Sequence, residues 1–241
     1  MAPMRKPFQG VRNIILFNWH FYLIAFTVLL FLLLTKWYIL LLVLLAMIFA
    51  SIIASFYIYD RSDLYEMKWA ASIDHPAIVI VNIHAGFDET SLLLREKFPQ
   101  SSLKVFDFYD PRQHTEISIK RARRAYPPFP GTQGINSTHI PLDDQHADKI
   151  FLTLSAHEIR DANERRLFFL ELKRVLKRDG SVFVTEHLRD LPNFLAYNIG
   201  YFHFISKQLW YRTFEDAGFK VIKEEKSTPF ITTFTLTRHG I

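Results

Sequence analysis

Cysteine is absent from the 241 residues of this chain. Disulfide bonds, thiolate nucleophiles and zinc or iron–sulfur sites with cysteine ligands are therefore excluded. The sequence also contains no phosphate-binding loop, no G-x-S-x-G turn and no pair of metal ligands at helical spacing. We accordingly expect no metal, no P-loop chemistry and no serine hydrolase of the G-x-S-x-G type.

Charged residues are absent from two long apolar stretches, Ile14–Leu34 and Tyr38–Tyr59. Each is about one bilayer in length, because a helix that rises ~1.5 Å per residue needs ~20 residues to cross ~30 Å. Only residues 35–37 separate them, so we expect a transmembrane hairpin of two antiparallel helices within residues 14–59. A secretory signal peptide has a single shorter apolar core and a cleavage site, and neither is present. We expect the segment to be retained.

Basic residues are unevenly distributed around these stretches. Arg5, Lys6 and Arg12 precede the first stretch, whereas Lys36 stands alone between the two. The positive-inside rule then predicts a plasma or inner membrane protein, with both termini and the larger domain in the cytoplasm. Residues 1–13 would form the cytoplasmic N-terminus, and residues 60–76 an interfacial connecting helix along the membrane surface.

The net charge of +5 favours an anionic partner. The densest basic cluster consists of Lys120, Arg121, Arg123 and Arg124. Beside a bilayer such a cluster attracts anionic membrane lipids, although a merely solvated helix face is an equal alternative. No nucleic-acid-binding motif accompanies it, so we expect no nucleic acid partner.

Residues 77–241 alternate between strand and helix patterns. Apolar or β-branched runs predict strands at 77–83, 103–111, 148–156, 181–187, 218–226 and 228–238. Helices are expected at 92–98, 112–126 and 162–177, and a long or broken aromatic helical region at 193–217. This order predicts an α/β fold with a mostly parallel sheet, helices on both faces and an antiparallel last strand.

Five segments then resemble class I S-adenosylmethionine-dependent methyltransferases, particularly the branch that acts on isoprenoid quinones and other lipidic substrates. They are VNIHAGFDETS after the first strand, VFDFYD at the second, HIPLDDQHADKIFLTLSAHEIRD, FFLELKRVLKRDGSVFVTEH, and WYRTFEDAGFKVI. The likeness covers roughly Ala77 to Thr237. It implies a Rossmann-like, seven-stranded methyltransferase domain and S-adenosyl-L-methionine as the cofactor. The chain departs from the family where His84 and Asp88 replace glycines and Asn82 replaces an acid.

The resemblance also implies where the cofactor lies. Its binding residues would be Asn82, Ile83, His84, Ala85, Gly86, Asp107, Phe108 and Ser155. In an open parallel sheet the ligand lies beyond the carboxyl ends of the strands. Asp107 would accept hydrogen bonds from the ribose hydroxyls, Phe108 would cover the adenine, and the backbone at Gly86 would admit the amino-acid tail. We therefore expect an open hollow between Gly86 and Asp107.

Polar pairs follow two neighbouring strands. His157 and Glu158 come after the strand at 148–156, and Glu186 and His187 after the strand at 181–187. Methyl transfer needs in-line positioning and, for a phenol or ammonium acceptor, a base. His157 is the preferred base as a neutral imidazole, with Glu158 and His187 as further catalytic candidates and Glu186 as a substrate contact. The alternatives are that His157 bonds a loop carbonyl and that Glu186 and His187 cap helices.

An aromatic segment follows the polar pairs. Tyr197, Tyr201, His203 and Trp210 are candidate substrate-binding residues in the region that covers the acceptor site in the family. Plain core packing is the alternative, since aromatic stripes at helical spacing usually face a core.

The function that these patterns favour is a membrane-anchored methyltransferase acting on a lipophilic small molecule such as a quinone, a phenolic lipid or an aminolipid. A methyltransferase-like scaffold of a membrane biosynthetic complex is the alternative from another class. A third possibility is an enzyme that uses the nucleoside pocket without methyl transfer.

Overall fold

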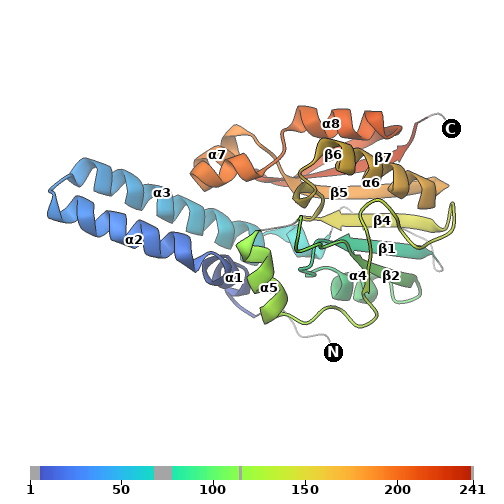
Figure 1. Cartoon of the computed structure of the whole chain (residues 1–241), viewed down its shortest axis with the longest axis horizontal. Coiled ribbons are helices and arrows are strands. Elements are labelled where there is room, and N and C mark those ends of the chain that lie inside the picture. The colour runs from blue at the N-terminus through green and yellow to red at the C-terminus, as the bar shows by residue number, and fades with distance from the viewer. Residues whose placement is uncertain (1–5, 68–77, 114–115, 240–241) are drawn as a thin grey trace.

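A computed structural model describes residues 6–67, 78–113 and 116–239. Seven strands form one sheet in the order β3-β2-β1-β4-β5-β7-β6 (Figure 1). The strands are β1 (Val79–His84), β2 (Ser102–Asp107), β3 (Gln133–Gly134), β4 (Ala147–Thr153), β5 (Leu176–His187), β6 (Phe219–Thr228) and β7 (Ile231–Arg238). All neighbours are parallel except those of β7, which runs antiparallel to both β5 and β6. The expected Rossmann-like sheet with an antiparallel last strand is confirmed.

The sheet domain contains α4 (Ser91–Lys97), α5 (Ile117–Ala125), α6 (Ala162–Val175), α7 (Leu191–Tyr197) and α8 (Lys207–Asp216). Helices α4, α6 and α8 cover the two faces of the sheet, whereas α5 packs against α1 (Gln9–Phe17) and α7 against α3 (Tyr38–Phe56). On one face Phe169 and Phe214 of α6 and α8 join a large buried cluster, and on the other Leu94 of α4 packs with Ile80 and Phe151. Because both faces are covered, the central strands contain continuous apolar runs, which is why the sequence predicted them.

The structure differs from the expected elements in small, explicable ways. β3 has only two residues and lies within a proline- and glycine-rich stretch that gave no strand signal. Helix α6 begins as expected, with the Asp161 carboxylate accepting a hydrogen bond from the Glu164 amide at 2.7 Å. It ends at Val175 rather than Lys177, because β5 already begins at Leu176.

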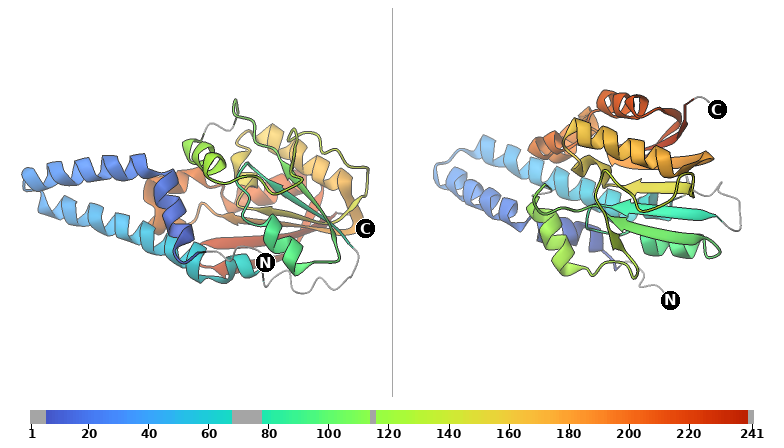
Figure 2. Two further views of the ribbon diagram at one scale, coloured as in Figure 1. Left: turned by 90° about the horizontal axis from the view of Figure 1, so that it is seen from below. Right: turned by 45° about the vertical axis from the view of Figure 1, so that its right-hand side comes forward.

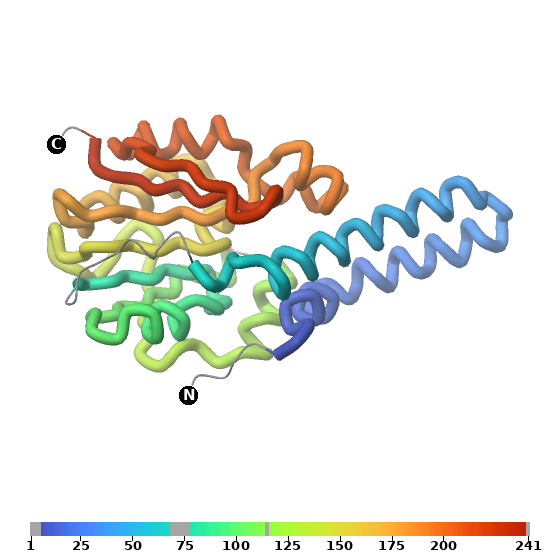
Figure 3. The backbone as a smooth tube through the Cα atoms, turned by 180° about the vertical axis from the view of Figure 1, so that it is seen from behind, coloured from blue at the N-terminus to red at the C-terminus, as the bar shows by residue number. Residues whose placement is uncertain are grey.

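The N-terminal apolar region forms α1 (Gln9–Phe17), α2 (Trp19–Leu34) and α3 (Tyr38–Phe56). α2 and α3 lie side by side and project away from the sheet domain (Figures 1 and 3). Among the described residues, one helix, Tyr38–Glu66, is long and apolar enough to cross a membrane by itself. A second span is present only if α1 and α2, which are bent by 74°, are taken together as one broken span.

The expectation of an unbroken helix over Ile14–Leu34 is therefore wrong. The chain bends at Asn18, whose side-chain amide donates to the Ile14 carbonyl at 3.0 Å and competes with the helical backbone pattern. Helix α1 is also held in place by the Asp60 carboxylate, which accepts hydrogen bonds from the amides of Gly10 and Val11 at 2.7 and 2.8 Å. The first apolar stretch thus belongs partly to the base of the hairpin.

The described part of residues 60–76 does not form the expected connecting helix along a membrane surface. Tyr57–Arg61 form a π-helical turn and Asp63–Glu66 a 3₁₀ turn, and residues 68–77 lie outside the described part of the chain. Leu64 and Met67 are each only 1% exposed. They pack with residues of the sheet domain rather than facing a membrane surface, so this segment joins the hairpin firmly to the domain.

Candidate functional site

A cavity of about 770 Å³ lies between the carboxyl edge of the sheet and the base of the hairpin. Its polar end is lined by His84, Glu116, His157, Glu158, His187 and His203. Its apolar end is lined by side chains of the hairpin region, including Ile14, Phe17, Phe21, Tyr22, Leu44 and Met47. The cavity thus has one wall of charged and imidazole side chains and one apolar wall. It lies at the carboxyl edge of the sheet, where ligands bind in open α/β folds.

His157 lies in a 3₁₀ turn, Ala156–Glu158, that follows β4. Its Nδ1 is 2.6 Å from Glu186 Oε2, and its Nε2 is 3.1 Å from Glu158 Oε1. The other Glu186 oxygen accepts hydrogen bonds from the amides of Ser155 and His157, both at 3.2 Å. Glu186 is fully buried and is not among the described residues that line the cavity. It therefore orients His157, rather than contacting a substrate as the sequence had suggested.

The two carboxylates decide the charge of His157. Burial alone would lower the pKa of this imidazole, but the adjacent Glu186 and Glu158 raise it to about 10. The ring is therefore an imidazolium near neutral pH. The interpretation of His157 as a neutral general base is wrong for this arrangement, because the sequence did not show that a second carboxylate lies behind the ring.

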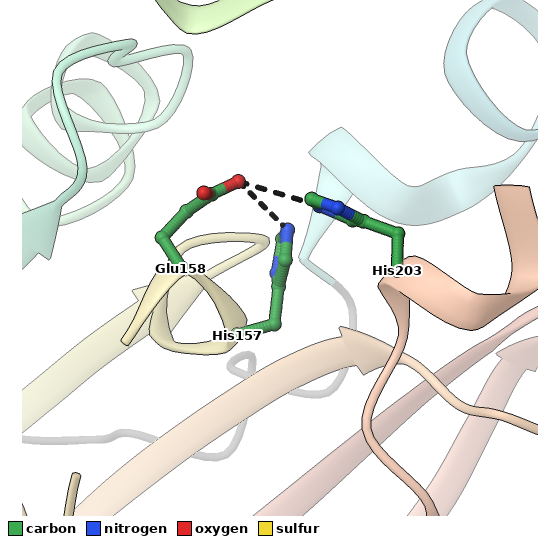
Figure 4. A group of neighbouring side chains, drawn as sticks. All are labelled: His157, Glu158 and His203. Carbon is green, nitrogen blue, oxygen red and sulfur yellow. Dashed lines mark ion pairs between the residues drawn. The ribbon is translucent and has the colours of Figure 1, made fainter. Parts of the chain in front are cut away.

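His203 reaches the same place from the 3₁₀ segment Asn198–His203. Its Nε2 is 3.5 Å from Glu158 Oε1, and its Nδ1 is 3.4 Å from Glu116 Oε1 at the start of α5. Burial raises the pKa of Glu158, but hydrogen bonds and charge from His157 and His203 outweigh it and hold that pKa well below its usual range. Figure 4 shows the three side chains converging, with Glu158 facing both rings.

His187, at the end of β5, lines the cavity but is held by protein groups on both ring nitrogens. Its Nε2 is 2.9 Å from the Tyr59 hydroxyl, and its Nδ1 is 2.9 Å from Asn193 Oδ1. The ring also stacks on Phe204 at 4.6 Å. Burial lowers its pKa to about 3 despite the hydrogen bond that its Nδ1 donates to Asn193. His187 is therefore neutral and fixed in orientation.

The ends of β1 and β2 meet at Gly86 and Asp107, as expected, but the space between them is filled. The Arg123 guanidinium, from α5, forms an ion pair with Asp107 Oδ2. A Cβ placed on Gly86, whose φ is +93°, would lie 2.5 Å from Arg123 Nη1 and 2.8 Å from its Cδ. The expectation of an open hollow is wrong, because Arg123 reaches across from a neighbouring helix. Its side chain remains 37% exposed, so it reaches in from the surface.

Side chains that replace family glycines hold the loop after β1. His84 Nδ1 accepts a hydrogen bond from the Gly86 amide at 3.0 Å, and Asp88 Oδ1 accepts bonds from the amides of Thr90 and Ser91 at 2.9 Å. The Asn82 amide donates to the hydroxyls of Thr90 and Ser91 at 3.0 and 2.8 Å. These bonds tie the loop to the start of α4, and burial lowers the pKa of His84.

Several expected contacts are instead buried structural residues. Ile83 and Ala85 belong to the core, and the Ser155 hydroxyl donates to the Ile83 carbonyl at 3.0 Å. Phe108 is 1% exposed and packs against Phe168, with ring centroids 5.4 Å apart. Phe108 nevertheless lines a second, smaller cavity, so its assignment to the adenine face stays a prediction.

The aromatic candidates divide between cavity and core. Tyr197 and His203 line the cavity, whereas Tyr201 is not among the described residues that do so. Tyr201 packs on Phe194, at a centroid separation of 5.5 Å. Trp210 is fully buried and stacks on Phe214 at 5.6 Å, so its interpretation as a substrate contact is wrong and core packing applies.

Sequence reasoning missed Arg123, Glu116 and Tyr59 as site residues. Arg123 was grouped with lipid-facing charges, yet it pairs with Asp107. Arg121 likewise donates to the Phe17 carbonyl at 2.5 Å and lies 2.8 Å from His20 Nδ1, so α5 packs against α1 (Figure 2). The only sequence signal for these contacts was the length of the arginine side chains. A side chain of that length can reach a neighbouring helix or strand as readily as it can extend into solvent.

A family model described as a methyltransferase domain matches residues 113–184, which span α5 to most of β5. No curated protein matches the chain. A solved structure of the PH0226 protein from Pyrococcus horikoshii has a TM-score of 0.55 at 13% identity, covering 73% of this chain and 88% of its own. An S-adenosylmethionine-dependent methyltransferase from Methanosarcina mazei has a TM-score of 0.53 at 14% identity, covering 71% of this chain and 97% of its own. A type 11 methyltransferase structure from Sulfolobus solfataricus has a TM-score of 0.51 at 18% identity, covering 73% and 92%.

The structural likenesses establish the methyltransferase fold. The family match indicates a methyltransferase domain in the part of the chain that it covers, residues 113–184.

Proposed function

We propose that this chain is a membrane-anchored, S-adenosylmethionine-dependent methyltransferase that acts on a lipophilic small molecule such as a quinone, a phenolic lipid or an aminolipid. The observation that carries the proposal is the cavity itself. It joins the polar carboxyl edge of a methyltransferase sheet to apolar side chains at the base of the hairpin. A molecule with a polar head and an apolar body matches both ends.

The residues present fit the cofactor at its nucleoside end. Asp107 ends β2 beside β1, and its carboxylate suits a pair of ribose hydroxyls. A second cavity, of about 290 Å³, lies next to it between residues 108–113 and 135–137 and has room for a base. At the other end Arg123 covers Gly86, so this proposal requires Arg123 to exchange its Asp107 contact for solvent when the cofactor binds.

When bound, S-adenosylmethionine supplies a sulfonium methyl group that is already primed for transfer. The chain's own contribution is then positioning. Asp107 would hold the ribose, the apolar wall would hold the acceptor's body, and the ionised Glu158 would accept a hydrogen bond from the acceptor's hydroxyl or ammonium. His187, neutral and fixed by Tyr59 and Asn193, would shape the wall beside it.

The anchor gives a reason for the acceptor class. The exposed apolar side chains of α2 and α3 favour insertion of the hairpin into a bilayer, with the basic N-terminal residues on the cytoplasmic side. A cavity at the base of such a hairpin lies at the depth where lipophilic molecules partition. A water-soluble acceptor would give no advantage to this placement.

A non-catalytic scaffold is the second candidate, and one observation favours it. The turn that admits the methionine part in the family is here occupied by Arg123, His84 and Asp88. In that case the domain would keep the fold and bind partner proteins of a membrane complex without transferring a methyl group.

The test is an incubation of the detergent-purified full chain with methyl-labelled S-adenosylmethionine and a total membrane lipid extract, read by mass spectrometry. We expect a labelled lipid that is heavier by one CH2 unit. In Asp107→Asn the cofactor should bind roughly 10- to 100-fold more weakly by calorimetry, since a hydrogen bond to a charged group contributes about 1.5–3 kcal/mol. Lys120→Gln, an exposed change on α5, is the control.

Stable partner proteins in a pulldown, with no labelled lipid, would favour the scaffold. Cofactor binding without any transfer of label would contradict methylation and favour another use of the nucleoside pocket.

A further inference from the structure

The polar wall of the cavity contains an arrangement of which the methyltransferase proposal uses only Glu158. His157, Glu158 and His203 each offer a ligand atom, and these atoms all lie within 4.8 Å of one another. They come from two segments far apart in the chain, one after β4 and one before α8. This is why a search for ligands at helical spacing found nothing and why we expected no metal.

Two of the three separations are close to those around a single ion. Glu158 Oε1 is 3.1 Å from His157 Nε2 and 3.5 Å from His203 Nε2, and the ligand atoms of the two histidines lie within 4.8 Å of each other. Two ligand atoms that are each about 2.1 Å from one ion are about 3.0 Å apart at octahedral angles and about 3.4 Å apart at tetrahedral angles. Binding an ion therefore keeps Glu158 between the two rings and requires the rings themselves to adjust.

Each imidazole is also oriented from behind by a carboxylate. Glu186 lies 2.6 Å from His157 Nδ1, and Glu116 lies 3.4 Å from His203 Nδ1. In metal sites a ligating histidine almost always gives its other ring N–H to a carboxylate, a carbonyl or a water, which fixes the ring and its tautomer. Here both rings have such an acid and both turn Nε2 toward Glu158.

We propose that His157, Glu158 and His203 bind one divalent first-row transition-metal ion at the polar end of the cavity. Two imidazoles and one carboxylate suit manganese, iron or zinc and leave coordination positions open. Those positions face the space for a polar head group, where a bound ion would lower the pKa of an oxygen ligand. The proposal does not depend on cofactor binding.

On binding, His157 loses a proton to the solvent, because only a neutral imidazole is a ligand, and one neighbour has to yield. Arg160 Nη1 donates to the His203 carbonyl at 2.5 Å, and Nη2 contacts both ring nitrogens of His203, Nδ1 more closely and Nε2 at 3.0 Å. The ion requires Nη2 to leave the ring, which also frees Nδ1 to donate to Glu116, whereas the Nη1 contact can remain and anchor the segment. Arg160 is exposed, with a 42% accessible side chain, and has room to move.

The test uses the full chain in detergent, treated with a chelator, without S-adenosylmethionine or lipid. Manganese binding is followed by electron paramagnetic resonance, cobalt binding by visible absorption, and zinc binding by calorimetry. We expect one ion per chain, a raised thermal unfolding temperature with the ion, and loss of both effects in His203→Gln. His203 lies at the cavity wall rather than in the core, so this variant should fold.

Two further variants separate binding from folding. Glu186→Gln should weaken binding by roughly 10–100-fold, as expected when the orienting partner of a ligand is changed. His139→Gln, at an exposed histidine outside the cluster, should bind like the original chain. Failure of the original chain to bind any of the three ions at millimolar concentration would overturn the proposal, as would equal binding by His203→Gln. Neither result bears on methyl transfer, which is measured separately.

Discussion

Arg123 forms an ion pair with Asp107 and lies against Gly86. A side chain on α5 therefore occupies the place where the sheet's first two strands would receive a nucleoside and its amino-acid tail. The same helix holds the base of the hairpin through Arg121, which donates to the Phe17 carbonyl. One short helix thus contacts both the proposed cofactor edge and the proposed membrane anchor.

Replacing Arg123 should make the cofactor edge more accessible. In Arg123→Gln we expect S-adenosylmethionine to bind several-fold more tightly in calorimetry, because a larger fraction of molecules has Asp107 and Gly86 uncovered. Arg124→Gln, on the same helix but exposed, is the matched control and should not change the affinity. Weaker binding by Arg123→Gln would instead show that this arginine itself holds the cofactor.

Filling the apolar end of the cavity should affect only the acceptor. Met47 lines this end, so Met47→Trp should raise the KM for a lipid acceptor while the affinity for S-adenosylmethionine stays the same. Leu42→Trp changes a residue of the same helix that is 63% exposed, and it should leave both quantities unchanged. Equal KM values for the two variants would contradict an acceptor at the base of the hairpin.

His187 should make the domain less stable in acid. Burial lowers its pKa from 6.5 to about 3, so between these values the unfolded chain binds a proton that the folded chain does not. The stability from the neutral ring is fully present above pH 6.5 and is lost as the pH falls toward 3. The contribution is at most one proton, or about 1.4 kcal/mol per pH unit.

Chemical unfolding at several pH values measures this effect. In His187→Gln the free energy of unfolding should fall less steeply below pH 6.5 than in the original chain. His139→Gln, at a histidine whose side chain is 74% exposed, serves as the reference. The same slope in His187→Gln and the original chain would show that His187 takes up its proton in the folded state.

A charge in the middle of α3 should weaken membrane association. Phe49 is 59% exposed on this helix, and an aspartate at the centre of a spanning helix costs about 2.5–3.5 kcal/mol. We expect Phe49→Asp to be released from isolated membranes by alkaline carbonate extraction, whereas the original chain stays in the pellet. Ile222→Asp, at a 55% exposed residue of β6, should behave like the original chain. Retention of Phe49→Asp in the pellet would mean that the hairpin does not carry the anchor.

The fold was largely predictable because its signals are local. Continuous apolar runs predicted β1, β4 and β5, which are covered on both faces, and the helix expected at 162–177 corresponds to α6. The bend at Asn18 and the two-residue β3 were not predicted. The bend depends on the Asn18 side chain, which hydrogen-bonds to a backbone carbonyl. Strand β3 depends only on its pairing with β2.

The site was less predictable, since its chemistry depends on partners from other elements. The order of the strands placed His157, Glu158 and His187 at one edge of the sheet, as expected. Their charge states followed from Glu186 behind one ring and from Tyr59 and Asn193 around another. Trp210 carried the same aromatic signal as Tyr197, and only packing separated core from cavity.

The sequence by itself determined the alternation of strands and helices, the two uncharged apolar stretches and the acid that ends β2, because periodicity, length and residue type act within a few neighbouring residues. Only the tertiary structure decided that Arg123 covers Gly86, that Glu158 faces two imidazoles, and that the hairpin base closes the cavity. A long side chain such as that of arginine can form ion pairs or hydrogen bonds of similar free energy with many partners. The connections between the strands determine which of these partners lie close enough to contact it.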